Sequence, residues 1–133
     1  MTETAHARPG VSGHGDFAWL LQGTEDWKPA HRLGLQVTNV YGDPTKPGIY
    51  VTRIKWPAHV MSLPHSHPGD RHVTVLSGTW FMGIDDTFDP AISRAAKPGS
   101  YTFQPAGAIH WDGTKEEEAV IQITGYGPTD DFP

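Results

Sequence analysis

The chain has 133 residues, a formal net charge of −5 and no cysteine. This length fits one domain, and 37% hydrophobic residues are enough for one core. The lack of cysteine excludes disulfides, thiolate metal sites and a cysteine nucleophile. The acidic balance, with no cluster of lysine and arginine, argues against nucleic acid as a partner.

The N-terminal residues 1–15 are expected to form a flexible arm, and residues 16–133 a single domain. The first ten residues lack the apolar core of a secretory signal. No apolar run approaches the length of a membrane span. We therefore expect a soluble, cytoplasmic protein without a membrane partner.

The 15 glycines and 12 prolines are spread along the chain, which is typical of many short strands with tight turns. Alternating apolar residues and β-branched content predict most of the strands. The expected strands are 33–40, 49–56, 73–76, 79–84, a short one after Gly99, and 119–125. Residues 17–21 fit a strand or a helical turn, 85–98 a polar loop, and 112–115 a hairpin turn.

Three histidines stand at positions that suggest a metal site. His65 and His67 are two residues apart, and side chains with this spacing share one face of a strand. His110 follows a turn glycine, a short apolar strand and a Pro-x-Gly turn. Imidazole suits iron, copper, zinc and nickel, so the ligand type alone does not choose the metal.

The stretch around His110 resembles the second sequence motif of the cupin superfamily, G-x5-P-x-G-x2-H. Every fixed position from Gly99 to His110 fits this motif. Thr114 stands where an asparagine usually closes it. The resemblance to cupins covers about residues 33–127 and implies an all-β jelly-roll, or double-stranded β-helix, barrel.

The first cupin motif, G-x5-H-x-H-x3-4-E-x6-G, is matched in part. His65, His67 and Gly78 fit it. His59 stands at the position of the leading glycine, and Arg71 stands where the glutamate belongs when counted back from Gly78. The usual cupin site has three histidines and a carboxylate, so a cation here replaces the expected acid.

The direction of Arg71 depends on the regularity of the strand. An unbroken strand from His67 turns Arg71 inward and His72 outward. A bulge at Pro68-Gly69 would shift the phase by one residue and make His72 a fourth metal ligand. Counting back from Gly78 places Arg71 at the position of the motif glutamate, and this favours an inward direction for its side chain.

Arginine cannot ligate a metal, because it has no lone pair to offer. Two outcomes fit the sequence. In the first, His65, His67 and His110 bind the metal, and Arg71 acts in catalysis by binding the anionic end of a substrate. In the second, the metal is lost and the cavity binds an anion. We favour the first, because all three histidines stand at motif positions.

The resemblance implies a metal-dependent enzyme acting on a small organic molecule. Some dioxygenases with cupin folds, such as β-diketone and thiol dioxygenases, use three histidines without a carboxylate. A non-haem iron dioxygenase, an oxidoreductase, is therefore the favoured function, with Fe(II) as cofactor and Zn, Mn, Ni or Cu as alternatives. The other hypotheses are a metal-assisted isomerase, lyase or decarboxylase, and a non-catalytic small-molecule-binding cupin. A homodimer is expected, with residues 17–21 available to pack against the partner.

Overall fold

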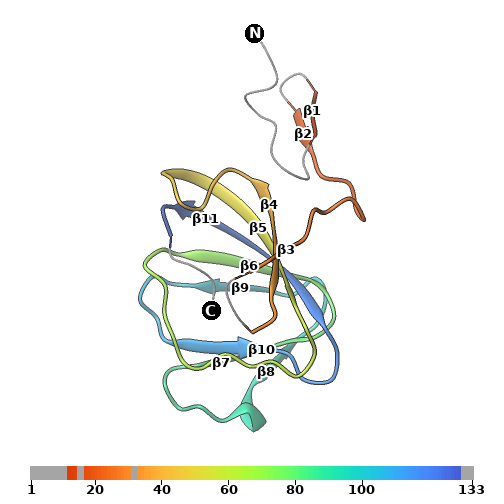
Figure 1. The fold of residues 1–133 in the computed structure, drawn as a ribbon. Helices are drawn as coiled ribbons and strands as arrows, with labels where there is room; N and C mark the ends of the chain where they lie inside the picture. Colours follow the sequence, from red (N-terminus) through yellow and green to blue (C-terminus); the bar gives the residue numbers. More distant parts are fainter. Residues whose placement is uncertain (1–11, 15–16, 31–32, 130–133) are drawn as a thin grey trace.

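The fold is all-β, as the sequence predicts. The computed structural model describes residues 12–14, 17–30 and 33–129 (Figure 1), and these contain eleven strands and one short 3-10 helix. The elements are β1 (Ser12–His14), β2 (Phe17–Trp19), β3 (Lys28–Pro29), β4 (Gln36–Tyr41), β5 (Gly48–Trp56), β6 (Arg71–Ser77), β7 (Trp80–Ile84), η2 (Pro90–Ile92), β8 (Arg94–Ala96), β9 (Tyr101–Gln104), β10 (His110–Gly113) and β11 (Ala119–Gly127).

Two antiparallel sheets form the jelly-roll barrel. The larger has the strand order β3-β4-β5-β11-β6-β9, and the smaller has the order β10-β7-β8. Figure 1 shows the smaller sheet facing the larger one across the interior. The strands β1 and β2 pair only with each other, in a separate hairpin that stands off one end of the barrel.

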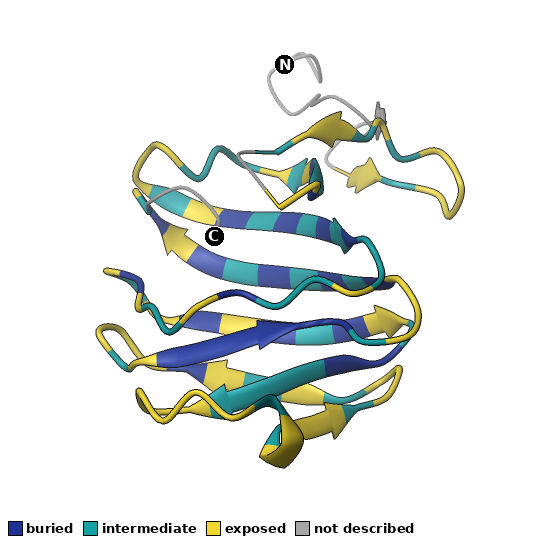
Figure 2. Ribbon diagram, turned by 60° about the horizontal axis from the view of Figure 1, so that its bottom comes forward, coloured by how far each residue is buried: buried dark blue, intermediate teal, exposed yellow. Residues whose placement is uncertain are grey.

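The long strands β5 and β11 supply much of the core because every second side chain points inward. Figure 2 shows this alternation as dark blue and teal bands along the long strands. The buried hydrophobic cluster between the sheets comprises Leu35, Tyr50, Ile54, Trp56, Val73, Val75, Trp80, Ala119, Ile121 and Ile123. This packed interior fixes which face of each strand points toward the site.

Residues 12–14, near the end of the expected N-terminal arm, form β1, and the rest of that arm lies outside the described residues. Two local expectations need correction. The expected loop 85–98 contains η2 and β8. Residues 112–113 are not part of a turn, since β10 continues through them and pairs with β7. Among the described residues, no helix is long and apolar enough to span a membrane.

The direction of the side chains on β10 is set by a contact between an indole and a glycine. Trp111 pairs with Gly83 of β7, and a Cβ atom built at Gly83 would lie 2.0 Å from Trp111 Cζ2. The indole therefore occupies the space that any other residue at position 83 would need. Since Trp111 points to that side, its neighbours His110 and Asp112 share the other face of β10.

Candidate metal centre

The structure brings His65, His67 and His110 together. Their ring centroids are 4.4 to 5.3 Å apart, and each offers a donor nitrogen within 4.8 Å of the others. The segment carrying His65 is not a regular strand. It is tied to β10 by two backbone hydrogen bonds, from His65 N to His110 O (2.8 Å) and from His110 N to His65 O (2.9 Å). These bonds bring the two motifs side by side.

The hydrogen bonds of two of these rings leave them suited to metal binding. His65 Nδ1 lies 2.7 Å from the carbonyl oxygen of Leu63, and His110 Nδ1 lies 3.2 Å from that of Ala108. A carbonyl oxygen only accepts, so Nδ1 carries the hydrogen and Nε2 keeps its lone pair. Both Nε2 atoms are buried without a hydrogen-bond partner among the described residues. Together with the neighbouring ring of His67, these two imidazoles form a group that fits a transition-metal ion.

The local electrostatics keep His110 neutral. Burial, the largest cause, lowers the pKa of His110 below its ordinary value, and the neighbouring His65 and Arg71 act in the same direction. The carboxylate of Asp112 and the carbonyl of Ala108 act against this shift. A neutral imidazole is the form that ligates a metal, so His110 is poised for ligation at neutral pH.

His72 is not part of this group, and the bulged register that would have made it a ligand is wrong. Its side chain is exposed on the outer face of the large sheet. There, His72 Nδ1 lies 2.6 Å from the hydroxyl oxygen of Tyr101, and the ring lies beside that of Phe103. The regular alternation of β6 places Arg71 inside and His72 outside.

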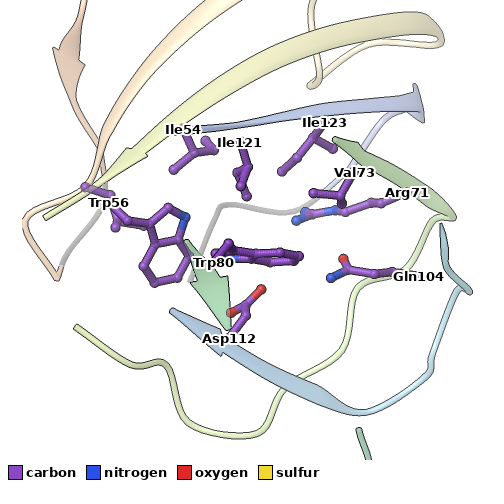
Figure 3. Close-up of a pocket in the computed structure, with 10 residues that line it drawn as sticks. Ile54, Trp56, Arg71, Val73, Trp80, Gln104, Asp112, Ile121 and Ile123 are labelled. Carbon is purple, nitrogen blue, oxygen red and sulfur yellow. The ribbon is translucent and has the colours of Figure 1, made fainter. Parts of the chain in front are cut away.

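Arg71 points inward, as the glycine count predicts, and its residue is only 2% exposed. Figure 3 shows its guanidinium with Gln104 and Asp112 around a small interior cavity, next to Trp80. The cavity measures about 10 Å³, which is about the space that one water molecule needs. An anionic substrate group larger than water does not fit there unless the cavity widens.

Two departures from the cupin motifs have local explanations. His59, at the position of the leading glycine, has a φ angle of 63°, the left-handed conformation in which glycine is favoured. Thr114, at the position of the closing asparagine, donates a hydrogen bond to the carbonyl oxygen of Pro57 and accepts one from Val60 N. Thr114 thus holds the loop before the histidines against the end of β10.

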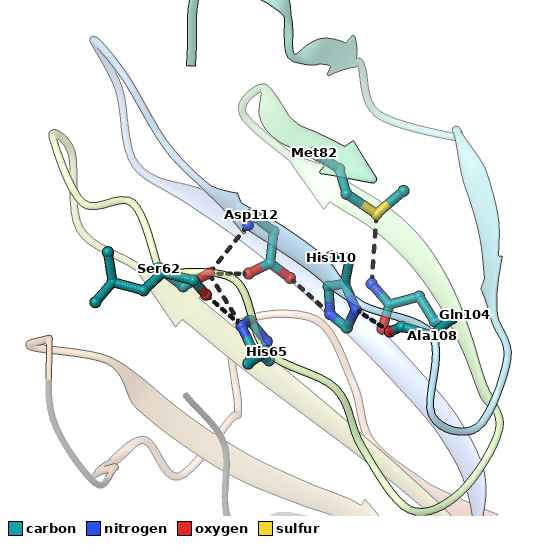
Figure 4. Close-up of polar contacts among 8 residues, drawn as sticks. Ser62, His65, Met82, Gln104, Ala108, His110 and Asp112 are labelled. Carbon is teal, nitrogen blue, oxygen red and sulfur yellow. Dashed lines mark hydrogen bonds and ion pairs between the residues drawn. The ribbon is translucent and has the colours of Figure 1, made fainter. Parts of the chain in front are cut away.

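Two polar residues of the site went unnoticed in the sequence. Asp112 and Ser62 are both buried, and Figure 4 shows them beside His110 and His65. The sequence pattern predicts a turn at Asp112, whereas on a strand its spacing of two residues from His110 places both side chains on the same face. No sequence signal marks Ser62.

An open pocket reaches the histidine group from outside. It has a volume of about 630 Å³, and His110 and Gln104 line it together with side chains of β7 and β9. The amide of Gln104 lies 3.5 Å from the sulfur of Met82, another lining residue. Two carboxylates, Asp85 and Asp86, also line this pocket. Its size and mixed lining suit a small organic molecule.

A two-sheet jelly-roll barrel with a histidine group between its two motifs defines a cupin. The sequence model of the ChrR cupin-like domain matches residues 19–130. The chain therefore belongs to the ChrR cupin-like domain family.

Comparisons with individual proteins support the fold. The chain is 25% identical over 87 residues to a germin-like protein 2-3 of Oryza sativa subsp. japonica, an alignment that covers 61% of this chain and only 39% of the relative. Among solved structures, it resembles the polyketide cyclase RemF from Streptomyces resistomycificus, with TM-score 0.65, 15% identity, and coverage of 82% of this chain and 80% of RemF. It also resembles the DMSP lyase DddQ from Ruegeria pomeroyi DSS-3, with TM-score 0.60, 18% identity, and coverage of 77% and 56% respectively.

Proposed function

We propose that this cupin binds one divalent transition-metal ion through His65, His67 and His110 and uses it to act on a small organic molecule. The observation that carries the proposal is the group of three imidazoles with donor atoms within 4.8 Å of one another. The bound ion would polarise an oxygen atom of the substrate and, if it is redox-active, also react with O₂. Fe(II) is the favoured ion, and Zn, Mn, Ni or Cu are alternatives.

The protein's own residues provide access and orientation. The buried side chains of His110 and Gln104 line the 630 Å³ pocket, whose lining also includes Met82, Ile84 and Phe103. An apolar body of a substrate can pack against these side chains, while the amide of Gln104 offers a hydrogen bond. The pocket thus presents one polar end of a small molecule to the histidine group.

A non-haem iron dioxygenase is the first candidate activity. Its support is a group of three histidines with a cation, Arg71, at the motif position of the glutamate. This resembles the ligand set of dioxygenases that use three histidines.

A metal-assisted isomerase, lyase or decarboxylase is the second candidate. Asp85 and Asp86 line the same pocket as His110, and a carboxylate there can accept a proton from a substrate whose negative charge the metal stabilises. Such chemistry needs no oxygen, so oxygen uptake separates the two candidates.

The metal assignment is tested by elemental analysis of protein purified without an affinity tag. We expect about one ion per chain in the wild type and loss of the ion in His67→Ala and His110→Ala, with the β-sheet circular dichroism unchanged. His72→Ala is the matched control, because it removes an exposed imidazole from the outer face, and it should keep the ion. A full complement of metal in both site variants would contradict the assignment.

The reaction class is tested with an oxygen electrode on the metal-loaded protein. Oxygen consumption on addition of a β-diketone or a thiol would support the dioxygenase. Turnover of a carbonyl compound under nitrogen would support the second candidate. Ligand binding without turnover in either experiment would make the protein a binding cupin and overturn both.

A further inference from the structure

One carboxylate lies beside the histidine group, at a place that the cupin motifs do not assign. Asp112 is 5% exposed and is the only Asp or Glu that is buried among the residues the structure describes. It stands two residues after His110 on β10, so both side chains point to the same face of the strand. A carboxylate in such surroundings needs hydrogen bonds or a cation to compensate for lost hydration.

Among the described residues, only one of its two carboxylate oxygens accepts a hydrogen bond. Ser62 Oγ donates a hydrogen bond to Asp112 Oδ1 at 2.8 Å and accepts one from Asp112 N at 3.0 Å. The other oxygen, Oδ2, lies 3.8 Å from His110 Nε2, the atom suited to bind the metal (Figure 4). Two ligand atoms on one tetrahedral ion, each about 2.0–2.1 Å from it, are about 3.3 Å apart. A small movement of the side chain therefore suffices for both to reach one ion.

The positive charges near the site would be partly neutralised by a carboxylate ligand. Three neutral imidazoles leave a divalent ion with its full charge, and the guanidinium of Arg71 adds another positive charge in the interior. Asp112 lies near both, since it lines the water-sized cavity together with Arg71 (Figure 3) and its Oδ2 lies 3.8 Å from His110 Nε2. Ligating carboxylates usually have such a hydrogen bond on their second oxygen, and Ser62 provides it here.

We propose that Asp112 is the carboxylate ligand of the metal centre, in place of the glutamate whose motif position Arg71 occupies. Ser62 then acts as a positioning residue that holds Asp112 through Oδ1. This inference rests on the proposed function, because it requires an ion at the three histidines. It completes a donor set of three nitrogens and one oxygen, two donors from β10 and two from the segment before β6.

The test is a titration of the metal-free protein with Co(II), followed by its visible absorption spectrum and by competition with a chelator. Asp112→Asn should lower the affinity for Co(II) by about 10–100-fold or more and change the absorption bands, because an anionic oxygen leaves the ion. Ser62→Ala should lower the affinity less and change the bands little. Glu116→Gln, which removes an exposed carboxylate, is the control and should match the wild type.

The outcomes separate the two proposals. No Co(II) binding by the wild type would overturn the proposed function itself. Wild-type affinity and spectrum in Asp112→Asn would overturn the role of Asp112 alone, as would a variant that loses only thermal stability. If the variant does not fold, a crystal structure of the metal-loaded wild type decides the question. Asp112 Oδ2 should then lie about 2.0–2.2 Å from the ion, and a separation above about 3 Å would refute the assignment.

Discussion

Arg71 gives the interior of this cupin a permanent positive charge where the family motif has a negative one. Its residue is almost completely buried, and its charge is among the causes that lower the pKa of His110. The same field disfavours any cation at the histidine group. Arg71 thus adds a positive contribution to the electrostatic field at His110.

We therefore predict that Arg71→Met binds a divalent ion more tightly than the wild type. Two like charges several ångströms apart in a protein repel by on the order of 1 kcal/mol at an effective dielectric constant of about 20, so the expected gain is up to about tenfold. Methionine keeps much of the volume of the arginine stem. The measurement is a Zn(II) titration in competition with a chelating dye, and Arg94→Met, which removes an exposed charge from β8, is the control. Equal or weaker binding by Arg71→Met would show that Arg71 supports the site.

At this scale, the spacing of the histidines together with the resemblance to the cupin motifs predicted the three histidines and the inward direction of Arg71. The motif positions of His65, His67 and His110 were enough to bring them together, although the segment of His65 is held by only an isolated bridge to β10. Asp112 was missed because a Gly-containing stretch with charged residues resembles a turn. Ser62 depends on a contact across 50 residues of chain, which no local pattern reveals.

The pairing of β7 with β10 is the element on which the site depends most. Gly83 leaves room for the indole of Trp111, which is also in edge contact with Phe88. This contact fixes the phase of β10 and therefore the direction of His110 and Asp112. A side chain at position 83 has to displace a buried indole.

Gly83→Ala is accordingly expected to lower the free energy of unfolding by about 1–3 kcal/mol, as is typical of overpacking, and to weaken metal binding at the same time. Urea unfolding and a Co(II) titration measure the two effects. Gly69→Ala is the control, since an added Cβ there would meet only Tyr126 O, at 3.7 Å. A variant with wild-type stability and affinity would show that β10 does not depend on this contact.

A second element-scale prediction concerns the segment before β3. Glu25 forms an ion pair with Arg53 of β5 at 2.8 Å, and Arg53 also donates to Gln122 of β11 at 2.9 Å. Hydrogen bonding to its own backbone N–H, the largest cause, together with Arg53 lowers the pKa of Glu25 from its ordinary value of 4.5, against burial, which raises it. The folded state thus favours the charged carboxylate.

The contribution of Glu25 to the free energy of unfolding is therefore expected to depend on pH. A lowered pKa in the folded state stabilises the protein above the unfolded pKa, and this contribution is lost as the pH falls through the folded pKa. Glu25→Gln should lower the free energy of unfolding by about 1 kcal/mol at pH 7, and the difference should shrink as the pH is lowered to 3. Urea unfolding at several pH values measures it. A difference that is constant with pH would exclude an electrostatic origin.

Sequence periodicity was sufficient to predict the long strands but not the short ones. β5 and β11 each bury every second residue, so their alternation is visible in the sequence. β8 has three residues, and all four residues of β10 are buried, so neither shows a period of two. Their strand character comes from pairing with β7, a tertiary contact.

Several large apolar side chains lie exposed outside the barrel, in and after the hairpin of β1 and β2. The hairpin of β1 and β2 pairs with no other strand in the described part of the chain, and a two-stranded hairpin alone is marginally stable in water. Phe17, Trp19 and Leu21 are 55–68% exposed in or after it. Exposed apolar groups of this size are typical of surfaces that contact another chain, and in a symmetric homodimer the same patch of each copy can cover that of the other.

We therefore predict that the protein is a homodimer held in part by residues 17–21. Static light scattering at micromolar concentration should give twice the 14.6 kDa mass of the chain. The double variant Phe17→Ser with Trp19→Ser should shift the mass toward the monomer and make the thermal midpoint less dependent on protein concentration. Ile92→Ser, which changes an exposed apolar residue of η2, should leave the dimer intact. A monomer mass for the wild type at micromolar concentration would exclude the dimer, and a dimeric double variant would place its interface elsewhere on the barrel.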